Sequence, residues 1–487
     1  MTNKKYCAPQ GLPDYMVIGG QRIKASNAVI ETFDPATGNK IGEVPAGTEA
    51  DVEQAVVSAK TALRGSWRNT TPVERGRLLA RVASRLRRDA ERFAIVETLD
   101  SGKPLAEARG DVETAAYYFE YYAGIADKLQ GDSIPLGQNF ISFTLHEPVG
   151  VTSHIIPWNF PLVTAARGVA PALAAGNTAV VKPASQTPLT AIMLAELMEE
   201  EGLPQGVCNV VTGSGRKLGA SLTSLPDIAH VTFTGSVATG QEVMRHAADA
   251  IASVTLELGG KSPVVVLADA DLDAAVTGIL KAIYMNAGQV CSAGSRLVIE
   301  RSAHAALIER LVPAAEALSV GHGLDNPQLG PLISSSQRDI VARYVDSAKS
   351  RGVEILTGGM TLHPTGLASS CFYAPTILDN LPDDDITVQE EIFGPVLAVQ
   401  IVESAEEAIA ASNCTRFGLC AGIYTKDISK AMRFARDVEA GQVFINQYFA
   451  GGVATPFGGV KHSGFGREKG LAALASYYQI KCVTARI

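Results

Sequence analysis

Apolar and polar positions change their spacing along the chain, and the change marks its main divisions. Up to about residue 130, a short β segment is followed by helical stretches. TPVE (71–74) has the spacing of a helix-capping box, with Pro72 at the first helical position. Apolar residues of the following RGRLLARVASRL share one helical face, and we expect this helix to end at Gly102.

From about residue 149 to 260 the pattern becomes a series of short apolar runs separated by segments with helical spacing. The runs are VGVTSHII, TAVVKP, CNVVTG, HVTFTG and SVTLELGG. Repeated β-α-β units predict a mainly parallel, doubly wound sheet, with ligand sites at the carboxyl ends of its strands.

A second series of this kind starts at SPVVVLADADLDAAVTGILKAI and continues to FGPVLAVQIV, which predicts a second α/β domain. Cys291 falls between the first helix of this series and its next strand. ISFTLHEP (141–148) and the C-terminal YYQIKCVTARI have strand patterns but belong to neither series. These two segments could pair across a subunit boundary.

Length and composition narrow the class of protein. The 487 residues exceed the roughly 250–300 that one core holds, so two or three domains are expected. A formal charge of −8 argues against a nucleic-acid or anionic-membrane partner. No apolar run reaches membrane-spanning length, and no apolar signal segment follows the N-terminal lysines. Seven cysteines without CxxC spacing argue against disulfides or a metal site and favour a reducing cytoplasm.

One cysteine has surroundings that packing does not explain. In NAGQVCSAGSR (286–296), Cys291 lies among glycine, serine and alanine residues that provide little apolar surface to bury it. Small neighbours leave room for other molecules to approach the sulfur, as a nucleophilic thiol requires. The alternative is an inert thiol, which is the commoner role of a single cysteine.

A glycine-containing turn in the first series is a candidate phosphate site. HVTFTGSVATGQE, with Gly235 and Gly240, has the order strand, turn, helix, in which backbone N–H groups could meet a pyrophosphate. The glycines do not fit GxGxxG, so a tight turn without ligand is an equal alternative. Lys182 ends another strand of the same predicted sheet, where its ammonium could reach a ribose or a phosphate.

Three further stretches place polar side chains where strands end or turns begin. PWNFP holds Asn159 between two prolines, and LELGGK places Glu257 at the end of an apolar strand, before two glycines. EEIFGP places Glu391 and Phe393 before a further strand. Taken singly, Asn159 could be a turn residue and Glu257 a solvated carboxylate.

Taken together, these stretches resemble the aldehyde dehydrogenase superfamily in its hydrolytic, non-phosphorylating branch. The resemblance extends from FDPATGNKIGEVP to FGGVKHSGFGREKG, and the separation of Glu257 and Cys291, 291 − 257 = 34, is typical of that family. It implies an α/β fold of two Rossmann-like doubly wound domains plus a small β oligomerisation element.

The implied domains have definite boundaries. Residues 1–126 and 148–257 form a cofactor-binding domain, and residues 258–446 form a catalytic domain that carries the cysteine. Residues 127–147 and 470–487 are oligomerisation strands, which implies a homodimer or homotetramer.

The resemblance also implies catalytic roles. Cys291 attacks the aldehyde to form a thiohemiacetal, which becomes a thioester after hydride transfer. The Asn159 side chain and the Cys291 backbone N–H form the oxyanion hole. Glu257 activates the hydrolytic water and Glu468 helps to relay protons. Because the thiolate is the reactive species, we expect the surroundings of Cys291 to lower its pKa.

The implied cofactor is NAD or NADP. Its contacts match seven positions of this chain: Trp158, Lys182, Ser185, Gly235, Ser236, Glu391 and Phe393. Many NAD-preferring members have a glutamate at the position of Ser185, where it accepts bonds from the adenosine ribose. Without that carboxylate a 2′-phosphate is not repelled, so we expect NADP to be accepted.

The substrate pocket is implied to include Phe160, Arg167 and Phe457. Arg167 resembles the arginine with which succinate-semialdehyde members bind a distal carboxylate, but Met285 replaces their second arginine. Aromatic-aldehyde members also have arginine there, and a structural ion pair is a further alternative. A semialdehyde or an aromatic aldehyde is therefore expected.

Two other functions compete with this one. A CoA-acylating dehydrogenase would not need the water that Glu257 activates, and a non-catalytic relative would not need Cys291. A P-loop kinase or ATPase is not supported, because GxxxxGK[ST] does not occur in the sequence.

Overall fold

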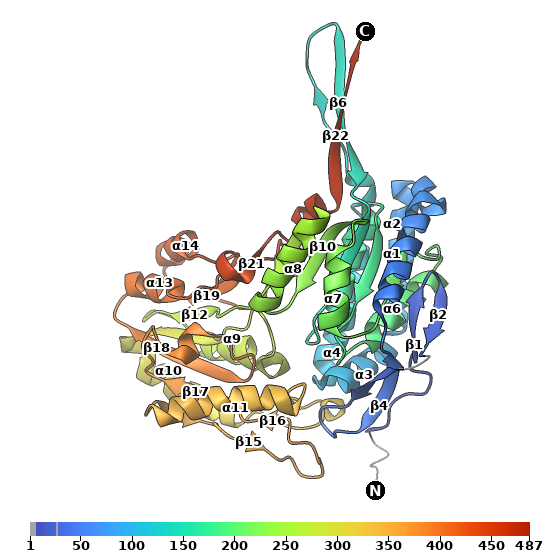
Figure 1. Ribbon diagram of the computed structural model, residues 1–487. Helices are drawn as coiled ribbons and strands as arrows, with labels where there is room; N and C mark the ends of the chain where they lie inside the picture. The colour runs from blue at the N-terminus through green and yellow to red at the C-terminus, as the bar shows by residue number, and fades with distance from the viewer. Residues whose placement is uncertain (1–5, 26–27) are drawn as a thin grey trace.

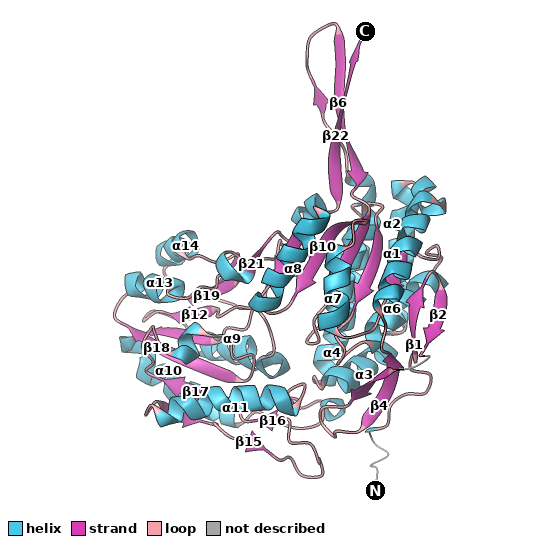
Figure 2. Cartoon of the chain, viewed as in Figure 1, coloured by secondary structure: helices cyan, strands magenta, loops and turns pink. Residues whose placement is uncertain are grey.

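The computed structural model describes residues 6–25 and 28–487. The start of the chain, which was considered above for a signal segment, includes residues 1–5, and these lie outside the described residues. Two lobes, each built on a β-sheet with helices packed against it, lie side by side (Figures 1 and 2). A narrow β arm, with the C-terminus at its tip, projects from the first lobe (Figure 1). Among the described residues, no helix combines the length and apolar character needed to cross a membrane.

The N-terminal region contains short strands and then four α-helices. The strands are β1 (Tyr15–Ile18), β2 (Gln21–Lys24), β3 (Val29–Phe33) and β4 (Lys40–Pro45). The helices are α1 (Glu49–Arg64), α2 (Pro72–Arg88), α3 (Ala90–Ser101) and α4 (Leu105–Ala123). The predicted capping box of Thr71 and Glu74 is confirmed, and Gly102 ends α3 in the left-handed conformation with φ of 84°.

The single helix predicted from Pro72 to Gly102 is wrong, because the chain breaks at Asp89. Asp89 has φ −97° and ψ 14°, and its carboxylate accepts a hydrogen bond from Arg85 Nε at 2.5 Å. The Asp89 N–H still donates to the Arg85 and Arg87 oxygens, but the Asp89 side chain makes no capping bond to the helix that follows. The break separates α2 from α3, which leads towards the site described below.

An eight-stranded sheet forms the centre of the first lobe, in the order β2-β1-β9-β8-β7-β10-β11-β21. Its parallel core consists of β7 (Val151–Ile155), β8 (Thr178–Lys182), β9 (Cys208–Val210), β10 (Ile228–Thr234) and β11 (Ser253–Glu257). The connecting helices are α5 (Pro161–Ala174), α6 (Leu189–Glu200), α7 (Gly215–Ser224) and α8 (Val237–Ala250). The predicted parallel, doubly wound arrangement is confirmed, and short antiparallel strands, including β21 (Gly464–Phe465), close its edges.

A seven-stranded sheet forms the second lobe, in the order β14-β17-β18-β13-β12-β19-β20. Its strands are β12 (Pro263–Val266), β13 (Arg296–Glu300), β14 (Glu354–Thr357), β17 (Thr376–Asp379), β18 (Val396–Val402), β19 (Cys420–Tyr424) and β20 (Gln442–Ile445). Its helices are α9 (Leu272–Tyr284), α10 (Arg301–Glu316), α11 (Ser335–Ser350), α12 (Ile386–Gln389), α13 (Ala405–Asn413) and α14 (Ile428–Asp437). Cys291 lies between α9 and β13, as predicted.

The arm consists of β6 (Phe140–Pro148) and β22 (Tyr478–Arg486), with β5 (Ser133–Ile134) at one edge. β6 and β22 pair with each other along their whole length, from Pro148 opposite Tyr478 to Phe140 opposite Arg486. Several apolar side chains of the arm are exposed, such as Ile141 at 52% and Ile480 at 65%. The domain boundaries given above, which assign residues 127–147 and 470–487 to oligomerisation strands, stay a prediction.

Candidate active site

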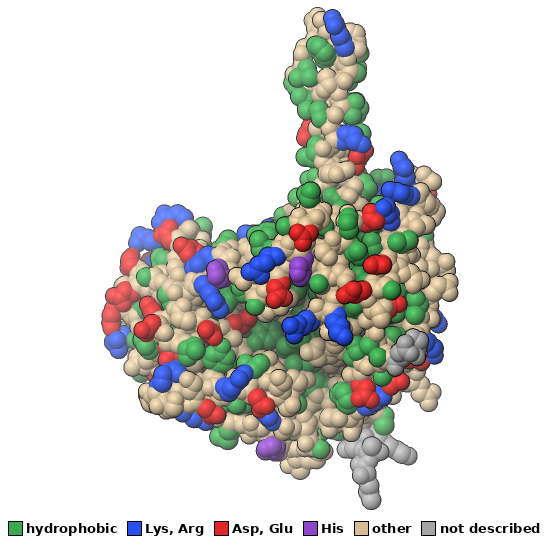
Figure 3. Space-filling model, in the orientation of Figure 1, with side chains coloured by type: hydrophobic (Ala, Val, Ile, Leu, Met, Phe, Trp, Pro, Cys, Tyr) green, Lys and Arg blue, Asp and Glu red, His purple; other side chains and the backbone are tan. Residues whose placement is uncertain are grey.

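A cleft of about 230 Å³ is lined by residues of both lobes. The face shown in Figure 3 is hollowed between the lobes, and apolar side chains show in the hollow. Eight of the predicted site residues line the cleft: Trp158, Asn159, Gly235, Ser236, Glu257, Cys291, Glu391 and Phe393. They come from strand ends of the first sheet and from loops of the second lobe, so the fold brings together stretches that are far apart in sequence.

The loop before Cys291 has an unusual backbone that presents the thiol to the cleft. Asn286 and Ala287 have φ of 48° and 54°, which non-glycine residues rarely adopt. A Cβ at Gly260 would lie 2.5 Å from the Cys291 carbonyl oxygen, so only glycine fits against this loop.

The pKa of Cys291 differs from our expectation. Burial raises the pKa of the thiol to about 11, although the Arg167 guanidinium opposes this. The expectation that the surroundings of Cys291 lower its pKa is therefore wrong for the free protein, because loss of hydration outweighs the nearby cation. A base must remove the thiol proton.

Asn159 is held firmly beside the Cys291 loop. Its Nδ2 donates a hydrogen bond to the backbone oxygen of Gln289 at 2.8 Å. Its own backbone oxygen accepts hydrogen bonds from Lys103 Nζ at 2.9 Å and Asn286 Nδ2 at 3.1 Å. Gln289 lies two residues before Cys291 in the chain. Its bond therefore fixes the Asn159 side-chain amide beside the cysteine loop, at the wall of the same cleft.

Glu257 ends β11 and is 1% exposed. Neither of its carboxylate oxygens has a hydrogen-bond partner among the residues that the structure describes. Burial, with a further contribution from the negative charge of Glu468, raises the pKa of Glu257 to about 8, while Arg167 acts in the opposite direction. A buried carboxylate with free lone pairs and a pKa near neutrality is suited to act as a general base.

Arg167 and Glu468 form a buried ion pair next to Glu257. The guanidinium also donates from Nη2 to Thr234 Oγ1 at 3.0 Å, and lies 5.6 Å from the ring centre of Phe457. This geometry matches the structural ion pair that the sequence left open as an alternative for Arg167. Neither Arg167, nor Phe457, nor Phe160 lines the cleft.

The cleft offers groups that fit a dinucleotide. Ser236 caps α8 by accepting a hydrogen bond from the Thr239 N–H at 3.3 Å, which leaves the first N–H groups of a 14-residue helix near the cleft. A Cβ at Gly259 would lie 2.2 Å from Glu391 Oε2 and would collide with it, so the absence of a side chain at Gly259 makes room for this carboxylate. Phe393, with φ of 57°, packs edge-on against Trp158 at 5.3 Å.

Two predicted cofactor residues lie outside this lining. Lys182 is 2% exposed, and its ammonium donates to the Pro183 oxygen at 2.9 Å; burial lowers its pKa to about 8. Ser185 donates its hydroxyl to the Gly213 oxygen at 3.0 Å and lines a second cavity, of about 320 Å³.

Sequence reasoning missed other residues of the site. Thr234 and Gln337 line the cleft, and Gln337 Nε2 donates to the backbone oxygen of Phe393 at 2.9 Å. Thr234 is the last residue of β10 and immediately precedes the predicted site residue Gly235, so its place in the sequence could have identified it as a cleft residue. Gln337 lies in the first turn of α11 without any motif around it. Within the described ranges, no cluster of His, Cys, Asp and Glu could hold a metal ion.

Comparison with known proteins agrees with this geometry. The model of the aldehyde dehydrogenase family matches residues 23–483. The chain belongs to this family. An aldehyde dehydrogenase from Aspergillus niger is 41% identical over 486 residues, covering 99% of this chain and 96% of that protein.

Solved structures of other aldehyde dehydrogenases have the same fold. The NAD+ complex of an aldehyde dehydrogenase from Bacillus cereus has a TM-score of 0.95 and 40% identity, covering 97% of this chain and 96% of that one. Betaine aldehyde dehydrogenase from Staphylococcus aureus, in complex with NAD+, has a TM-score of 0.95 and 36% identity, covering 98% and 95% of the two chains. The α/β fold predicted for this aldehyde dehydrogenase is thus confirmed.

Proposed function

We propose that this aldehyde dehydrogenase oxidises an aldehyde to the free carboxylic acid, with NAD+ or NADP+ as the hydride acceptor. The observation that supports this best is the grouping of Cys291, Asn159 and Glu257 around one cleft that also contains the N-terminus of α8. A thiol, an amide donor and an unpartnered carboxylate are the three groups that acyl chemistry through a thioester requires.

The first step is addition of Cys291 to the aldehyde. Glu257 takes the thiol proton, and the sulfur bonds to the carbonyl carbon to form a thiohemiacetal. Asn159 Nδ2 and the Cys291 backbone N–H donate hydrogen bonds to the oxyanion. Loss of one such donor typically costs a factor of ~10²–10³ in rate.

The second half returns the enzyme to its starting state. The nicotinamide cofactor, when bound, supplies the acceptor for the hydride that leaves the thiohemiacetal carbon. Cys291 then carries a thioester. Glu257 first releases the thiol proton to solvent and then takes a proton from water while the hydroxide adds to the thioester carbon. The C–S bond breaks to release the acid, and Glu257 returns its proton to the Cys291 sulfur.

The residues that would hold the cofactor lie on the two sides of the cleft. Ser236 and the first turn of α8 would bind the pyrophosphate, and Glu391 and Lys182 the two riboses. Phe393 and Trp158 would pack near the nicotinamide ribose. Because Ser185 provides no carboxylate, we expect kcat/KM for NAD and NADP to differ by less than about a hundredfold, or ~2.7 kcal/mol.

For the substrate, an aromatic aldehyde has more support than a carboxylated semialdehyde. The charge of Arg167 is already paired with Glu468, so it is not free to bind a distal carboxylate. Replacing Arg167 with alanine tests the semialdehyde. An unchanged KM for carboxylated aldehydes would exclude a role of Arg167 in binding them.

We also infer a homodimer or homotetramer assembled through the arm. A small projecting sheet with exposed apolar residues such as Ile141 and Ile480 is marginally stable alone. Light scattering after gel filtration should give two or four times the chain mass of 51.2 kDa. A monomer would contradict this inference.

One assay tests the proposed function. A panel of aromatic, aliphatic and carboxylated aldehydes is incubated with each cofactor, without coenzyme A, while reduced nicotinamide is followed by absorbance and the free acid by chromatography. We expect equal amounts of reduced cofactor and free acid. Absence of turnover with every aldehyde, or a requirement for coenzyme A, would contradict the proposal.

A further inference from the structure

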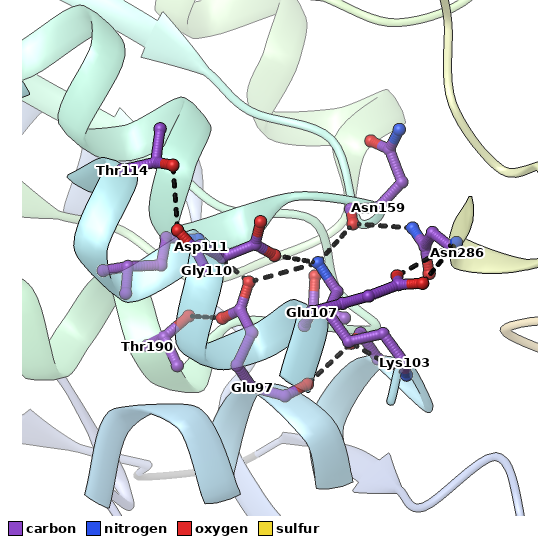
Figure 4. A network of polar contacts seen from close by, with 12 residues as sticks. Glu97, Lys103, Glu107, Gly110, Asp111, Thr114, Asn159, Thr190 and Asn286 are labelled. Carbon is purple, nitrogen blue, oxygen red and sulfur yellow. Dashed lines mark hydrogen bonds and ion pairs between the residues drawn. The ribbon is translucent and has the colours of Figure 1, made fainter. Parts of the chain in front are cut away.

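A cluster of buried and half-buried charges lies behind Asn159, outside the cleft. We call it the Lys103 cluster; it consists of Glu97, Lys103, Glu107 and Asp111 (Figure 4). Lys103 is 1% exposed and forms ion pairs with Glu97 at 3.7 Å and with Asp111. The four residues lie on α3, on α4 and on the turn between these helices, far in sequence from the predicted catalytic residues.

The cluster makes direct contact with both loops that form the predicted oxyanion hole. Lys103 Nζ donates to the Asn159 backbone oxygen at 2.9 Å, and Asn286 Nδ2 donates to the same oxygen at 3.1 Å. The Glu107 carboxylate accepts the Asn286 backbone N–H at 3.0 and 3.2 Å. Figure 4 shows this continuous path from the helices to Asn159 and Asn286.

The members of the cluster are fixed on their other sides as well. Glu97 accepts hydrogen bonds from Thr190 Oγ1 at 2.7 Å and from the Leu162 N–H at 3.4 Å. The Lys103 ammonium lies 4.3 Å from the ring centre of Phe160. Burying charges costs free energy even when they are paired, so a cluster of this kind is weak evidence for a stabilising role. Its contacts indicate a role in geometry.

We propose that Lys103 and Asn286 are positioning residues for the reaction: they hold the Asn159 backbone so that its side-chain amide meets the oxyanion formed on Cys291. This inference rests on the proposed function. A misplacement of about 1 Å at a reacting group costs up to ~10² in rate. Loss of the Lys103 contact should therefore slow oxyanion-forming steps by about 10- to 100-fold.

Lys103→Met tests the proposal, because methionine keeps the length and apolar stem of the side chain but not its charge or hydrogen bonds. We expect kcat for aldehyde oxidation to fall by about 10- to 100-fold, and cofactor-free hydrolysis of an activated ester to fall equally, because both reactions pass through an oxyanion. Alkylation of Cys291 by iodoacetamide forms no oxyanion, so its rate should stay within about threefold. The dissociation constant of NAD+ should also stay unchanged.

A double-mutant cycle separates positioning from general packing. If Lys103 acts through Asn159, Lys103→Met should cost less than about threefold when it is added to Asn159→Ala. The matched control is Thr114→Val. Thr114 Oγ1 donates to the Gly110 oxygen on the same helix α4, but this bond is not connected to Asn159 (Figure 4). The control should match the wild type in all assays.

If Lys103→Met does not fold, Asn286→Asp replaces it, because aspartate tolerates the left-handed backbone but offers no donor to the Asn159 oxygen. The same pattern is expected, with at least a fivefold fall in both oxyanion-forming reactions. Equal losses in alkylation and ester hydrolysis, full additivity with Asn159→Ala, or unchanged rates would overturn the proposal. If instead the wild type oxidises no aldehyde, the proposed function has failed, and the ester and alkylation assays still decide the role of Lys103.

Discussion

Two groups of buried charge lie near the cleft, and they differ in how completely they are hydrogen-bonded. In the Lys103 cluster, the Lys103 ammonium pairs with the carboxylates of Glu97 and Asp111 and donates a hydrogen bond to the Asn159 backbone oxygen. Both carboxylate oxygens of Glu107 accept the backbone N–H of Asn286. Glu257 is equally buried, yet neither of its oxygens has a hydrogen-bond partner among the described residues.

The difference supports the proposed roles, in which the Lys103 cluster holds geometry and Glu257 takes part in the reaction. A buried carboxylate without partners costs folding free energy, roughly 1–3 kcal/mol for an unsatisfied polar group and more for a charged one. Such a cost is typical of functional sites, where a lone pair must stay free for a proton. Lys103, which has two hydrogen bonds and a second carboxylate at 3.7 Å, is already engaged by its neighbours and fixes the loops around the cleft.

The largest expected effect comes from removing the nucleophile. Cys291→Ala should lower aldehyde oxidation by about 10⁴-fold or more, because no thioester can form. Binding of NAD+, measured by fluorescence titration, should stay within about threefold of the wild type. Residual oxidation within a hundredfold of the wild type would show that the reaction does not pass through this sulfur.

Next in size is the loss of the unpartnered carboxylate. Glu257→Gln keeps the shape but cannot accept a proton, so steady-state turnover should fall by ~10²–10⁴. Asp111→Asn, a carboxylate-to-amide change in the Lys103 cluster, is the matched comparison and should have a much smaller effect. Equal losses in the two variants would remove the distinction between reacting and positioning groups.

The pH dependence sharpens the comparison further. In the proposed mechanism Glu257 must be ionised to accept a proton, so activity should fall as the pH drops below its pKa of about 8. Glu468 raises the pKa of Glu257 and Arg167 lowers it. Glu468→Gln should therefore move the acid limb of the kcat profile to lower pH, and Arg167→Gln should move it to higher pH. Shifts in the same direction would contradict this account of the electrostatics.

A smaller effect is expected at Ser185, whose hydroxyl is already satisfied by the Gly213 oxygen. Ser185→Glu adds a carboxylate that repels a 2′-phosphate, so the ratio of kcat/KM for NAD to that for NADP should rise about tenfold or more. Ser185→Ala is the control and should change the ratio by less than about threefold. An unchanged ratio in Ser185→Glu would place this residue away from the adenosine ribose.

The sequence predicted residues that line the cleft better than the groups that contact them from behind. Cys291, Asn159 and Glu257 could be proposed because the stretches around them together resemble the aldehyde dehydrogenase family, although the local pattern of each alone left another explanation open. Lys103 could not be identified as a partner of Asn159, and Glu468, although named as a candidate proton relay, could not be identified as the partner of Arg167. The members of these pairs are 56 and 301 residues apart in the chain (159 − 103 and 468 − 167), and no local pattern joins them. The pKa of Cys291 was mispredicted for a related reason, since burial depends on the whole fold.

The most direct test of the central claim is intact-protein mass spectrometry of Glu257→Gln after it has been mixed with an aldehyde and NAD+. Without Glu257 only the small fraction of Cys291 that ionises unaided reacts, so the first step is slow, but each hydride transfer traps the sulfur as a thioester that no base helps to hydrolyse. After a long incubation we therefore predict a mass increase of one acyl group per chain, located on Cys291 by peptide mapping. Wild-type protein treated in the same way should show little adduct. An unmodified Cys291 in a variant that still reduces NAD+, or an acyl group on another residue, would contradict the claim.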